Sequence, residues 1–246
     1  MIDQQPSLNQ LPNEIKPAFQ ELQVLKHLRD AGFKKKFGFS CTDLFRLVFV
    51  LLFHQKNWFR LLESKKGERF PGKDTVYRFL NHSGYAWRRF LFALSGETIT
   101  RMEPLTSSNW ETAFIFDDSM FERNRSKAME MLARFKDHAT GAFYKDFRML
   151  TMGWSDGYSF VPMDFALLSS AKSGITGVTD GIDKRSHGYK RRQEAFCSAP
   201  QVIRSHAGSC IKNRYLGVVR PDGQLVYACA THSGSPLSRA ACDRHG

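Results

Sequence analysis

Two adjacent carboxylates, Asp117 and Asp118, follow a short apolar run in the string Phe-Ile-Phe-Asp-Asp-Ser. The run Ala113–Phe116 is compact and rich in aromatic residues, which predicts a buried strand rather than a helix. A carboxylate held at the tip of such a strand can bind Mg²⁺ or Mn²⁺, and two such ions can activate water and stabilise the leaving 3′ oxygen of a phosphodiester. Because side chains alternate along a strand, only one of the two acids can face such a site. The alternative is a turn in which Asp118 or Ser119 caps the next segment.

A dense cationic string, Lys-Arg-Ser-His-Gly-Tyr-Lys-Arg-Arg, occupies residues 184–192. Positive side chains at this density predict contacts with the phosphates of a nucleic acid. A solvated cationic loop is the alternative interpretation. The candidate phosphate-binding residues are Lys184, Arg185, Lys190, Arg191 and Arg192.

The overall charge of the chain also favours an anionic partner. The chain of 246 residues has 36 Lys and Arg against 24 Asp and Glu, which gives a net charge of +12 and a pI of about 9.6. An excess of this size favours a polyanionic partner, either nucleic acid or an anionic membrane face. A basic surface without a partner is the alternative.

Cysteine usage and hydropathy indicate the compartment. Five cysteines at irregular spacing, with no Cys-x-x-Cys pair, fit a reducing environment. A zinc site built from Cys210, Cys229, Cys242 and the late histidines lacks ligand pairs at finger spacing. The polar segment Met1–Pro17 has no signal-peptide core, and the apolar run Phe45–Phe53 is too short to span a bilayer. We therefore expect a cytoplasmic, nucleoid-associated protein with no membrane contact.

Helical periodicity dominates the first part of the chain after a flexible leader at residues 1–18. Apolar residues recur at helical spacing over Phe19–Phe33, which predicts one amphipathic helix. A second helix is expected over Leu44–Gln55, where three preceding residues can cap its N-terminus: Ser40, Thr42 and Asp43.

Two further helices are expected on either side of a short turn. Thr75–Leu80 and Tyr85–Phe92 have helical patterns, and Asn81–Gly84 between them is a turn signal. Two short helices joined by a glycine-containing turn suit a helix-turn-helix-like DNA-binding unit. An ordinary helical bundle with a basic surface fits equally well. The candidate DNA-binding residues here are Lys73, Arg78, Arg88 and Arg89.

The periodicity changes after a Ser/Thr-rich junction at Pro104–Trp110, a candidate domain boundary. Arg148–Trp154 and Tyr158–Leu168 have β-like patterns, and Ser155-Asp156-Gly157 between them is a strong hairpin signal. Asp156 is therefore interpreted as a turn residue and not as a catalytic one. Ser126–Phe135 has a helical pattern. Strand, helix and hairpin in succession predict a mixed α/β domain that starts near residue 111.

The ordered strings of this second part resemble the bacterial insertion-sequence transposases of the cut-and-paste DDE type. The resemblance covers roughly residues 20–203 and is carried by Asp117-Asp-Ser-Met-Phe121, Arg125-Ser-Lys127, Leu132-Ala-Arg134, Asp137-His138, Phe147–Gly157, Phe160-Val-Pro162, Leu167–Ser170, Asp183–Ser186, Arg191-Arg192 and Glu194-Ala195. It implies an RNase H-like catalytic domain in which Asp117, or as second choice Asp118, is the first of three metal-binding acids. It also implies that residues 25–97 form the DNA-binding part.

The chain departs from the family pattern after about residue 203. The second aspartate of the family should follow Ala199 by some twenty residues, and the third acid, a glutamate, much later; neither is present in this chain. Shifted by one nucleotide with permitted synonymous codons, His206–Thr231 reads MLDRALKTGISASYVLMDSWFTHAPL, which contains the missing aspartate motif. We therefore expect a frameshift near Val202–Ser205 and an irregular, out-of-frame tail at residues 204–246 that lacks the strands needed to complete the sheet.

These patterns together predict a mixed α/β chain with a helical DNA-binding region at 19–110 and an incomplete RNase H-like domain at 111–203. The resemblance implies a transposase that binds the terminal inverted repeats of its element and, in the complete family form, cleaves and transfers strands with Mg²⁺ or Mn²⁺. With one acid as metal ligand, Asp117, this chain is expected to lack cleavage. The alternative is a non-catalytic DNA-binding protein that inhibits the full-length enzyme, as a homodimer or a mixed dimer.

Overall fold

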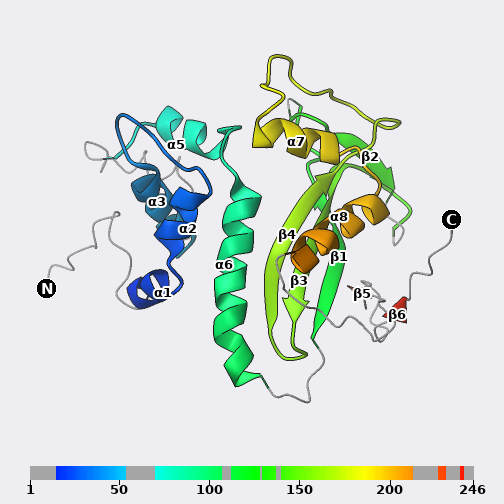
Figure 1. The fold of residues 1–246 in the computed structure, drawn as a ribbon. Helices are drawn as coiled ribbons and strands as arrows, with labels where there is room; N and C mark the ends of the chain where they lie inside the picture. The colour runs from blue at the N-terminus through cyan, green and yellow to red at the C-terminus, as the bar shows by residue number, and fades with distance from the viewer. Residues whose placement is uncertain are drawn as a thin grey trace, which may run out of the picture. The chain divides into compact units, whose positions relative to one another are not determined.

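The computed structural model describes residues 15–53, 70–106, 112–127, 129–136, 140–212, 227–230 and 239–240. The chain is mixed α/β (Figure 1) and forms two compact units, residues 1–90 and 91–246. The division falls inside helix α6, Trp87–Met102, whereas the expected boundary at Pro104–Trp110 follows that helix and lies partly outside the described residues.

Unit 1 is helical. It contains α1 (Lys16–Glu21), α2 (Val24–Asp30), α3 (Cys41–Phe53), α5 (Lys73–Leu80) and the start of α6. The N-cap prediction for α3 is confirmed, because the Ser40 hydroxyl accepts a hydrogen bond from the Asp43 N–H at 3.1 Å. The predicted leader up to residue 14 and the expected end of α3 at His54 and Gln55 lie outside the described residues.

The single helix expected over Phe19–Phe33 is wrong. Gln23 adopts a left-handed conformation with φ of 48°, and this separates α1 from α2. A helix cannot continue through a left-handed residue, so apolar periodicity alone did not predict the break.

Aromatic side chains hold unit 1 together. Phe33 is 2% exposed, and its ring lies 4.6 Å from the ring of Tyr85 and 4.5 Å from that of Trp87. Phe79 on α5 contacts the same group, with its ring 5.6 Å from Trp87. The segment after α2, helix α5 and the start of α6 are therefore fixed to one another by stacked and edge-on rings.

Unit 2 is built on an antiparallel meander of three strands. These are β1 (Ala113–Glu122), β3 (Phe143–Ser155) and β4 (Phe160–Leu168), with β3 in the middle. The predicted hairpin is confirmed: β3 and β4 are joined at Asp156–Ser159, where Gly157 has φ of +94°.

The helix predicted over Ser126–Phe135 is wrong. Its end forms strand β2 (Ala133–Lys136), which pairs with the first residues of β3, Phe143–Asp146. Pairing with the exposed start of a long strand satisfies the backbone of this segment, and such tertiary pairing overrides a weak helical pattern.

The segment beyond residue 203, expected to be irregular, contains regular structure. Helix α7 (His187–Glu194) is followed by α8 (Ala199–Lys212), which continues through the expected boundary. Further on, β5 (Tyr227–Ala230) pairs in parallel with Phe114–Asp117 of β1, and β6 (Arg239–Ala240) pairs with β5. The expectation that the tail adds no strand to the sheet is therefore also wrong.

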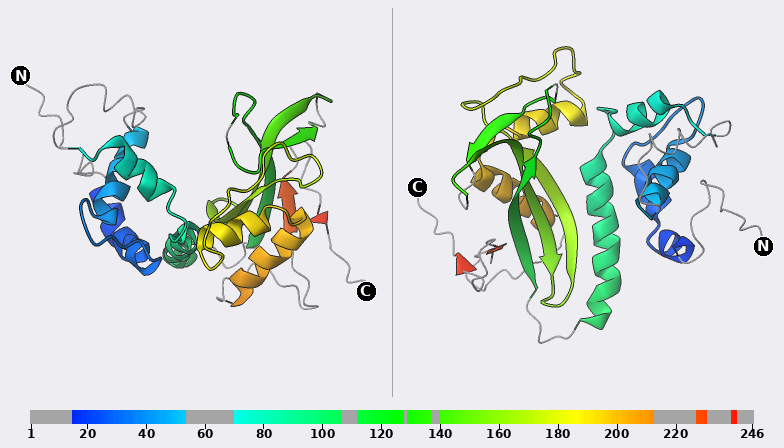
Figure 2. Two further views of the ribbon diagram at one scale, coloured as in Figure 1. Left: turned by 90° about the horizontal axis from the view of Figure 1, so that it is seen from above. Right: turned by 180° about the vertical axis from the view of Figure 1, so that it is seen from behind.

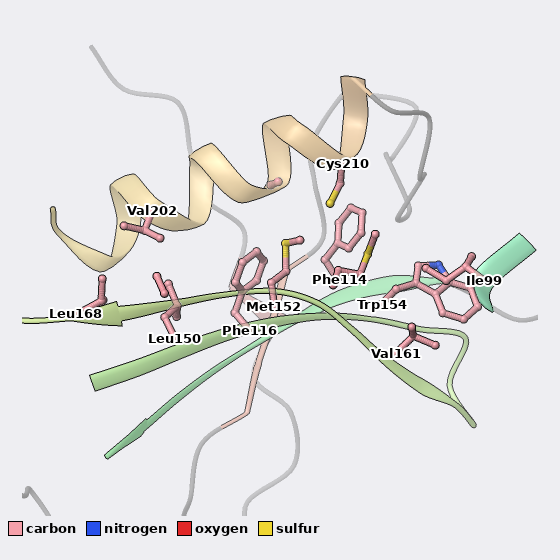
Figure 3. Packing of buried hydrophobic residues seen from close by; sticks show 13 residues of the cluster. Ile99, Phe114, Phe116, Leu150, Met152, Trp154, Val161, Leu168, Val202 and Cys210 are labelled. Atoms are coloured by element: carbon pink, nitrogen blue, oxygen red, sulfur yellow. The ribbon is translucent and has the colours of Figure 1, made fainter. Parts of the chain in front are cut away.

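Helices α7 and α8 cover one face of the meander (Figure 2). Val202, Ala207 and Cys210 of α8 are buried against Phe114 and Phe116 of β1, in a cluster that includes Leu150 and Met152 of β3 (Figure 3). The part of α6 within unit 2 adds Ile99 to this cluster, and Ser95 donates a hydrogen bond to the Pro162 carbonyl at 2.5 Å. Burial of these apolar side chains holds the helices on the sheet.

Candidate functional site

Asp117 and Asp118 lie in the middle of β1 and not at its tip. The expected strand ended at Phe116, but β1 continues to Glu122 because β3 supplies a paired residue at every position from Ala113 to Glu122. Asp117 is opposite Thr151 of β3, and Asp118 is opposite Leu150. The acids are therefore held on a central strand, which excludes the turn interpretation.

The two carboxylates point to opposite faces of the sheet, as strand alternation requires. Asp118 lies an even number of residues from Phe114 and Phe116, so its side chain is on the same face of β1 as theirs, the face covered by α8. Its carboxylate forms a two-point ion pair with Arg148 of β3, with Nε 3.1 Å from Oδ1 and Nη2 bonded to Oδ2. Asp118 thus already has a cationic partner within the protein.

Asp117 faces away from α8 and has a different partner. The Ser119 hydroxyl donates a hydrogen bond to Asp117 Oδ2 along the same strand. Both side chains are half-buried. This pair offers oxygen atoms from two side chains but only one negative charge, whereas Mg²⁺ is usually held by one or two carboxylates with water completing its six ligands.

The residues present do not fit the pair of divalent cations that the family resemblance implies. The two acids face opposite sides of the sheet, and one of them is neutralised by Arg148. Among the described residues, no group of three or more His, Cys, Asp or Glu side chains could hold a metal ion.

The cationic string is divided by the structure into exposed and internally bonded residues. Ser186 caps α7 by accepting a hydrogen bond from the Tyr189 N–H at 3.2 Å. Lys184, Arg185 and Lys190 are exposed. Arg185 lies 3.5 Å from Asp183, but its side chain is 94% exposed, so this pair holds it weakly.

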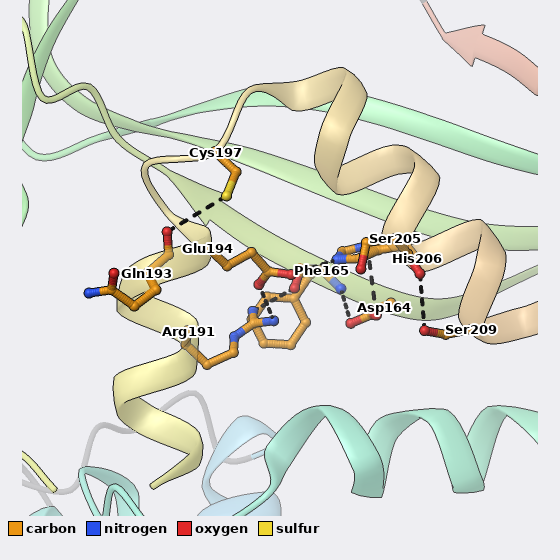
Figure 4. Close-up of polar contacts among 9 residues, drawn as sticks. All are labelled: Asp164, Phe165, Arg191, Gln193, Glu194, Cys197, Ser205, His206 and Ser209. Carbon is orange, nitrogen blue, oxygen red and sulfur yellow. Dashed lines mark hydrogen bonds and ion pairs between the residues drawn. The ribbon is translucent and has the colours of Figure 1, made fainter. Parts of the chain in front are cut away.

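Arg191 and Arg192 are engaged inside unit 2. Arg191 donates to the Phe165 carbonyl at 2.5 Å and pairs with Glu194 at 2.9 Å (Figure 4). Arg192 pairs with Glu130 at 2.5 Å. Burial raises the pKa of Glu130, but hydrogen bonds from Thr179 and from Arg192 outweigh it and hold the pKa below its ordinary value. These two arginines therefore fix α7 to the sheet side of the unit.

A buried polar group under α8 was missed by the sequence reasoning. His206 is fully buried, with Nε2 3.2 Å from Glu194 Oε1 and Nδ1 3.7 Å from Asp164 Oδ2 (Figure 4). Burial, together with the nearby Asp164 carboxylate, raises the pKa of the Cys210 thiol to about 12. The spacing of Val202, His206 and Cys210, four residues apart, is the helical signal that could have found this face.

Two other aspartates differ in role. Asp156 is the turn residue that the sequence predicts, because Oδ1 accepts from the Ser159 N–H at 2.7 Å and the Tyr158 N–H at 3.0 Å. Asp146 on β3 is fully buried, and burial raises its pKa above the ordinary value despite hydrogen bonds from the Phe147 and Phe121 N–H groups. Nothing in the local sequence distinguishes Asp146 as buried.

The candidate DNA-binding residues of unit 1 lie on α5 and at the start of α6. Lys73, Arg78 and Arg89 are exposed and Arg88 is half-buried. The sequence reasoning missed three consecutive lysines, Lys34–Lys36, which line a cavity together with Arg78. The three consecutive lysines are visible in the sequence and could have predicted a basic surface at this position.

The fold and site define a mixed α/β chain with a helical unit, a central strand that carries two acids, and exposed cations in both units. Comparisons of the chain with protein-family models, with curated proteins and with solved structures find no match. No helix among the described residues combines the length and apolarity needed to cross a membrane.

Proposed function

We propose that this chain is a DNA-binding protein of insertion-sequence transposase descent that occupies the ends of its element without cleaving them. Descent is supported by the position of Asp117 and Asp118 on β1. Strand β1 pairs from Ala113 to Glu122 with β3, the middle strand of the meander. A DDE transposase carries its first acid on such a strand.

The strand order supports an RNase H-like domain. After the antiparallel meander β1–β3–β4, the chain passes through α7 and α8 and returns as β5, parallel to β1. Parallel pairing requires a crossover of this kind, and helices usually supply it. The order β4-β3-β1 of the meander fits the core expected of that fold. Strand β5 lies in the segment that the frameshift hypothesis takes as out of frame, so its pairing with β1 counts against that hypothesis and does not support descent.

The observation that supports the absence of cleavage is that Asp117 has no second acid beside it, because Asp118 faces the other side of the sheet and is paired with Arg148. Phosphoryl transfer by this class depends on metal ions that stabilise developing negative charge. Asp117 is the one acid that this strand can supply, and among the described residues no group of three or more His, Cys, Asp or Glu side chains could complete a metal site around it. This favours the alternative to an active transposase, a non-catalytic inhibitor that occupies the repeats in place of the full-length enzyme.

The experiment that tests this proposal measures DNA binding and DNA strand cleavage on the same duplex. The probe is a labelled duplex that carries the inverted repeat flanking the encoding gene, with a scrambled duplex as control. We expect a metal-independent mobility shift that prefers the repeat, and no nicking in Mg²⁺ or Mn²⁺. Nicking of the repeat would contradict the absence of cleavage, whereas failure to shift either duplex would contradict DNA binding itself.

A further inference from the structure

We propose that Lys34, Lys35, Lys36, Arg78 and His82 form a site for a backbone phosphate of DNA in unit 1. This site rests on the proposed DNA-binding function and names where a DNA strand is held. The five residues line one cavity of about 370 Å³ between the segment after α2 and helix α5. None of the described residues that line it is acidic.

The cations of this site are available to a ligand. Lys34, Lys35, Lys36 and Arg78 are all exposed. None of the four takes part in an ion pair within the parts of the chain that the structure describes. Four positive charges around one concave surface attract an anion, and none of the described residues that line this surface is acidic.

His82 contributes a hydrogen-bond donor of defined position. Its Nδ1 accepts a hydrogen bond from the Gly84 N–H at 3.1 Å, so in the neutral ring the proton is on Nε2. The ring also stacks on Tyr85, with centroids 4.1 Å apart and planes 18° apart. The ring is thereby held at the cavity with one N–H left to donate to a phosphate oxygen.

Tyr85 anchors the lysine segment at the cavity. Its hydroxyl donates to the Lys34 carbonyl at 3.4 Å and lies 3.2 Å from Cys41 Sγ. Burial, with the hydrogen bond to Cys41 as a second cause, raises the pKa of Tyr85, so the hydroxyl stays neutral and adds no negative charge beside the lysines. Phe33, the residue before Lys34, is 2% exposed and stacks on the same ring.

The chemistry of these side chains favours a phosphodiester backbone over other anions. Lysines act as point charges that position a phosphate without reading bases. Arg89 at the start of α6 and the three lysines belong to one unit of a chain with a net charge of +12. A chain of phosphates, rather than a single anion, can neutralise several such cations at once.

The experiment measures the salt dependence of binding to a labelled DNA duplex by the full chain. The test variant is Lys34→Gln/Lys35→Gln/Lys36→Gln. The matched control is Lys127→Gln/Lys136→Gln/Lys172→Gln, which removes the same charge from exposed lysines of unit 2. We expect the test variant to lose about tenfold or more in affinity. The slope of log K against log salt should shrink by about 0.9 for each lysine that neutralises a phosphate, with a much smaller change in the control.

A second variant, His82→Phe, keeps an aromatic ring beside Tyr85 and removes the donor. We expect it to weaken DNA binding several-fold with unchanged far-UV circular dichroism. In the wild-type chain, addition of the duplex should shift the His82 imidazole NMR signals more than the same concentration of inorganic phosphate does.

Each of the following outcomes would contradict the proposed phosphate site. Equal losses in the test and control variants would show that only overall charge matters. A His82 shift with inorganic phosphate but none with the duplex would assign the cavity to small anions, and tighter binding of poly-glutamate than of DNA would assign it to an acidic protein segment. If the wild-type chain binds no DNA, the site and the proposed function both fail; if it binds and the test variant binds equally, only the site fails.

Discussion

The guanidinium of Arg148 on β3 bridges to the carboxylate of Asp118 on β1 through two nitrogen atoms. The pair joins neighbouring strands diagonally, because Asp118 is opposite Leu150 and Arg148 is opposite Met120. An acid that the family resemblance makes a candidate metal ligand therefore serves here as the partner of an arginine.

Loss of this ion pair should destabilise unit 2 only modestly. The side chains of Asp118 and Arg148 are 24% and 43% exposed, so solvent screens their attraction, and the coupling energy should be about 1 kcal/mol or less. Urea unfolding of Asp118→Asn, Arg148→Met and the double variant measures it as a double-mutant cycle. A coupling energy well above about 1 kcal/mol would contradict this expectation and show that solvent does not screen the pair.

The Arg148→Met variant of this cycle also tests whether Arg148 prevents a metal ion from binding to Asp118. If Arg148 is what keeps cations from Asp118, Arg148→Met should gain Mn²⁺ binding, detectable by paramagnetic broadening of nearby NMR signals. We expect no such gain, because Asp117 remains on the opposite face and cannot join Asp118 as a ligand.

Asp156 should make the stability of unit 2 depend on pH. Hydrogen bonds from the Ser159 N–H, and then from Tyr158 and Thr106, lower the pKa of this carboxyl below its ordinary value of about 3.8, against the opposing effect of burial. A lowered folded-state pKa means that the stabilisation is present above the unfolded pKa and is lost as pH falls through the folded pKa.

The measurement for Asp156 compares the wild-type chain with Asp156→Asn in urea at a series of pH values. The wild-type chain should be the more stable above about pH 4, and the difference should disappear as the pH falls further. Asp180→Asn, at an exposed turn position, is the control. A difference that stays constant with pH would contradict the assigned hydrogen bonds.

Thiol reactivity should separate the cysteines of the described residues. Cys197 is exposed, whereas Cys41 and Cys210 are buried, and burial raises the pKa of Cys210 to about 12. Thiolates are the reactive form, so Cys210 should react slowly for both reasons. In a Cys229→Ala/Cys242→Ala background, a disulfide reagent should modify one thiol rapidly and the other two only upon unfolding. Rapid modification of Cys210 would show that α8 does not stay packed.

The encoding DNA tests the expected frameshift directly. Helix α8 continues through Val202–Ser205, and both the present frame and the shifted frame begin this region with helix-forming sequence. The codons for His206–Thr231 should have the third bases that produce the shifted string with its aspartate motif. Any other third-base pattern removes the hypothesis. Restoring the frame should then yield a longer protein, whose metal-dependent nicking can be compared with that of this chain.

The sequence by itself determined the parts of the fold that depend on local patterns. The hairpin at Asp156-Gly157 needs a residue that accepts positive φ, and the glycine is visible in the sequence. The cap of α3 at Ser40, the turn between α5 and α6, and the opposite directions of Asp117 and Asp118 also follow from neighbouring residues alone. Local stereochemistry decides each of these features, so no distant partner had to be known.

Only the tertiary structure decided where the strands end and which charged side chains form contacts within the protein. Strand β1 extends past Phe116 because β3 is long enough to pair with it to Glu122, and Ala133–Lys136 becomes a strand because β3 has a free edge there. Arg191 and Arg192 are indistinguishable from Lys190 in the sequence, yet Phe165, Glu194 and Glu130 engage the two arginines. Apart from the pair of Arg191 with Glu194, three residues away, these outcomes depend on contacts between residues far apart in the chain, and a local sequence pattern contains no information about such contacts.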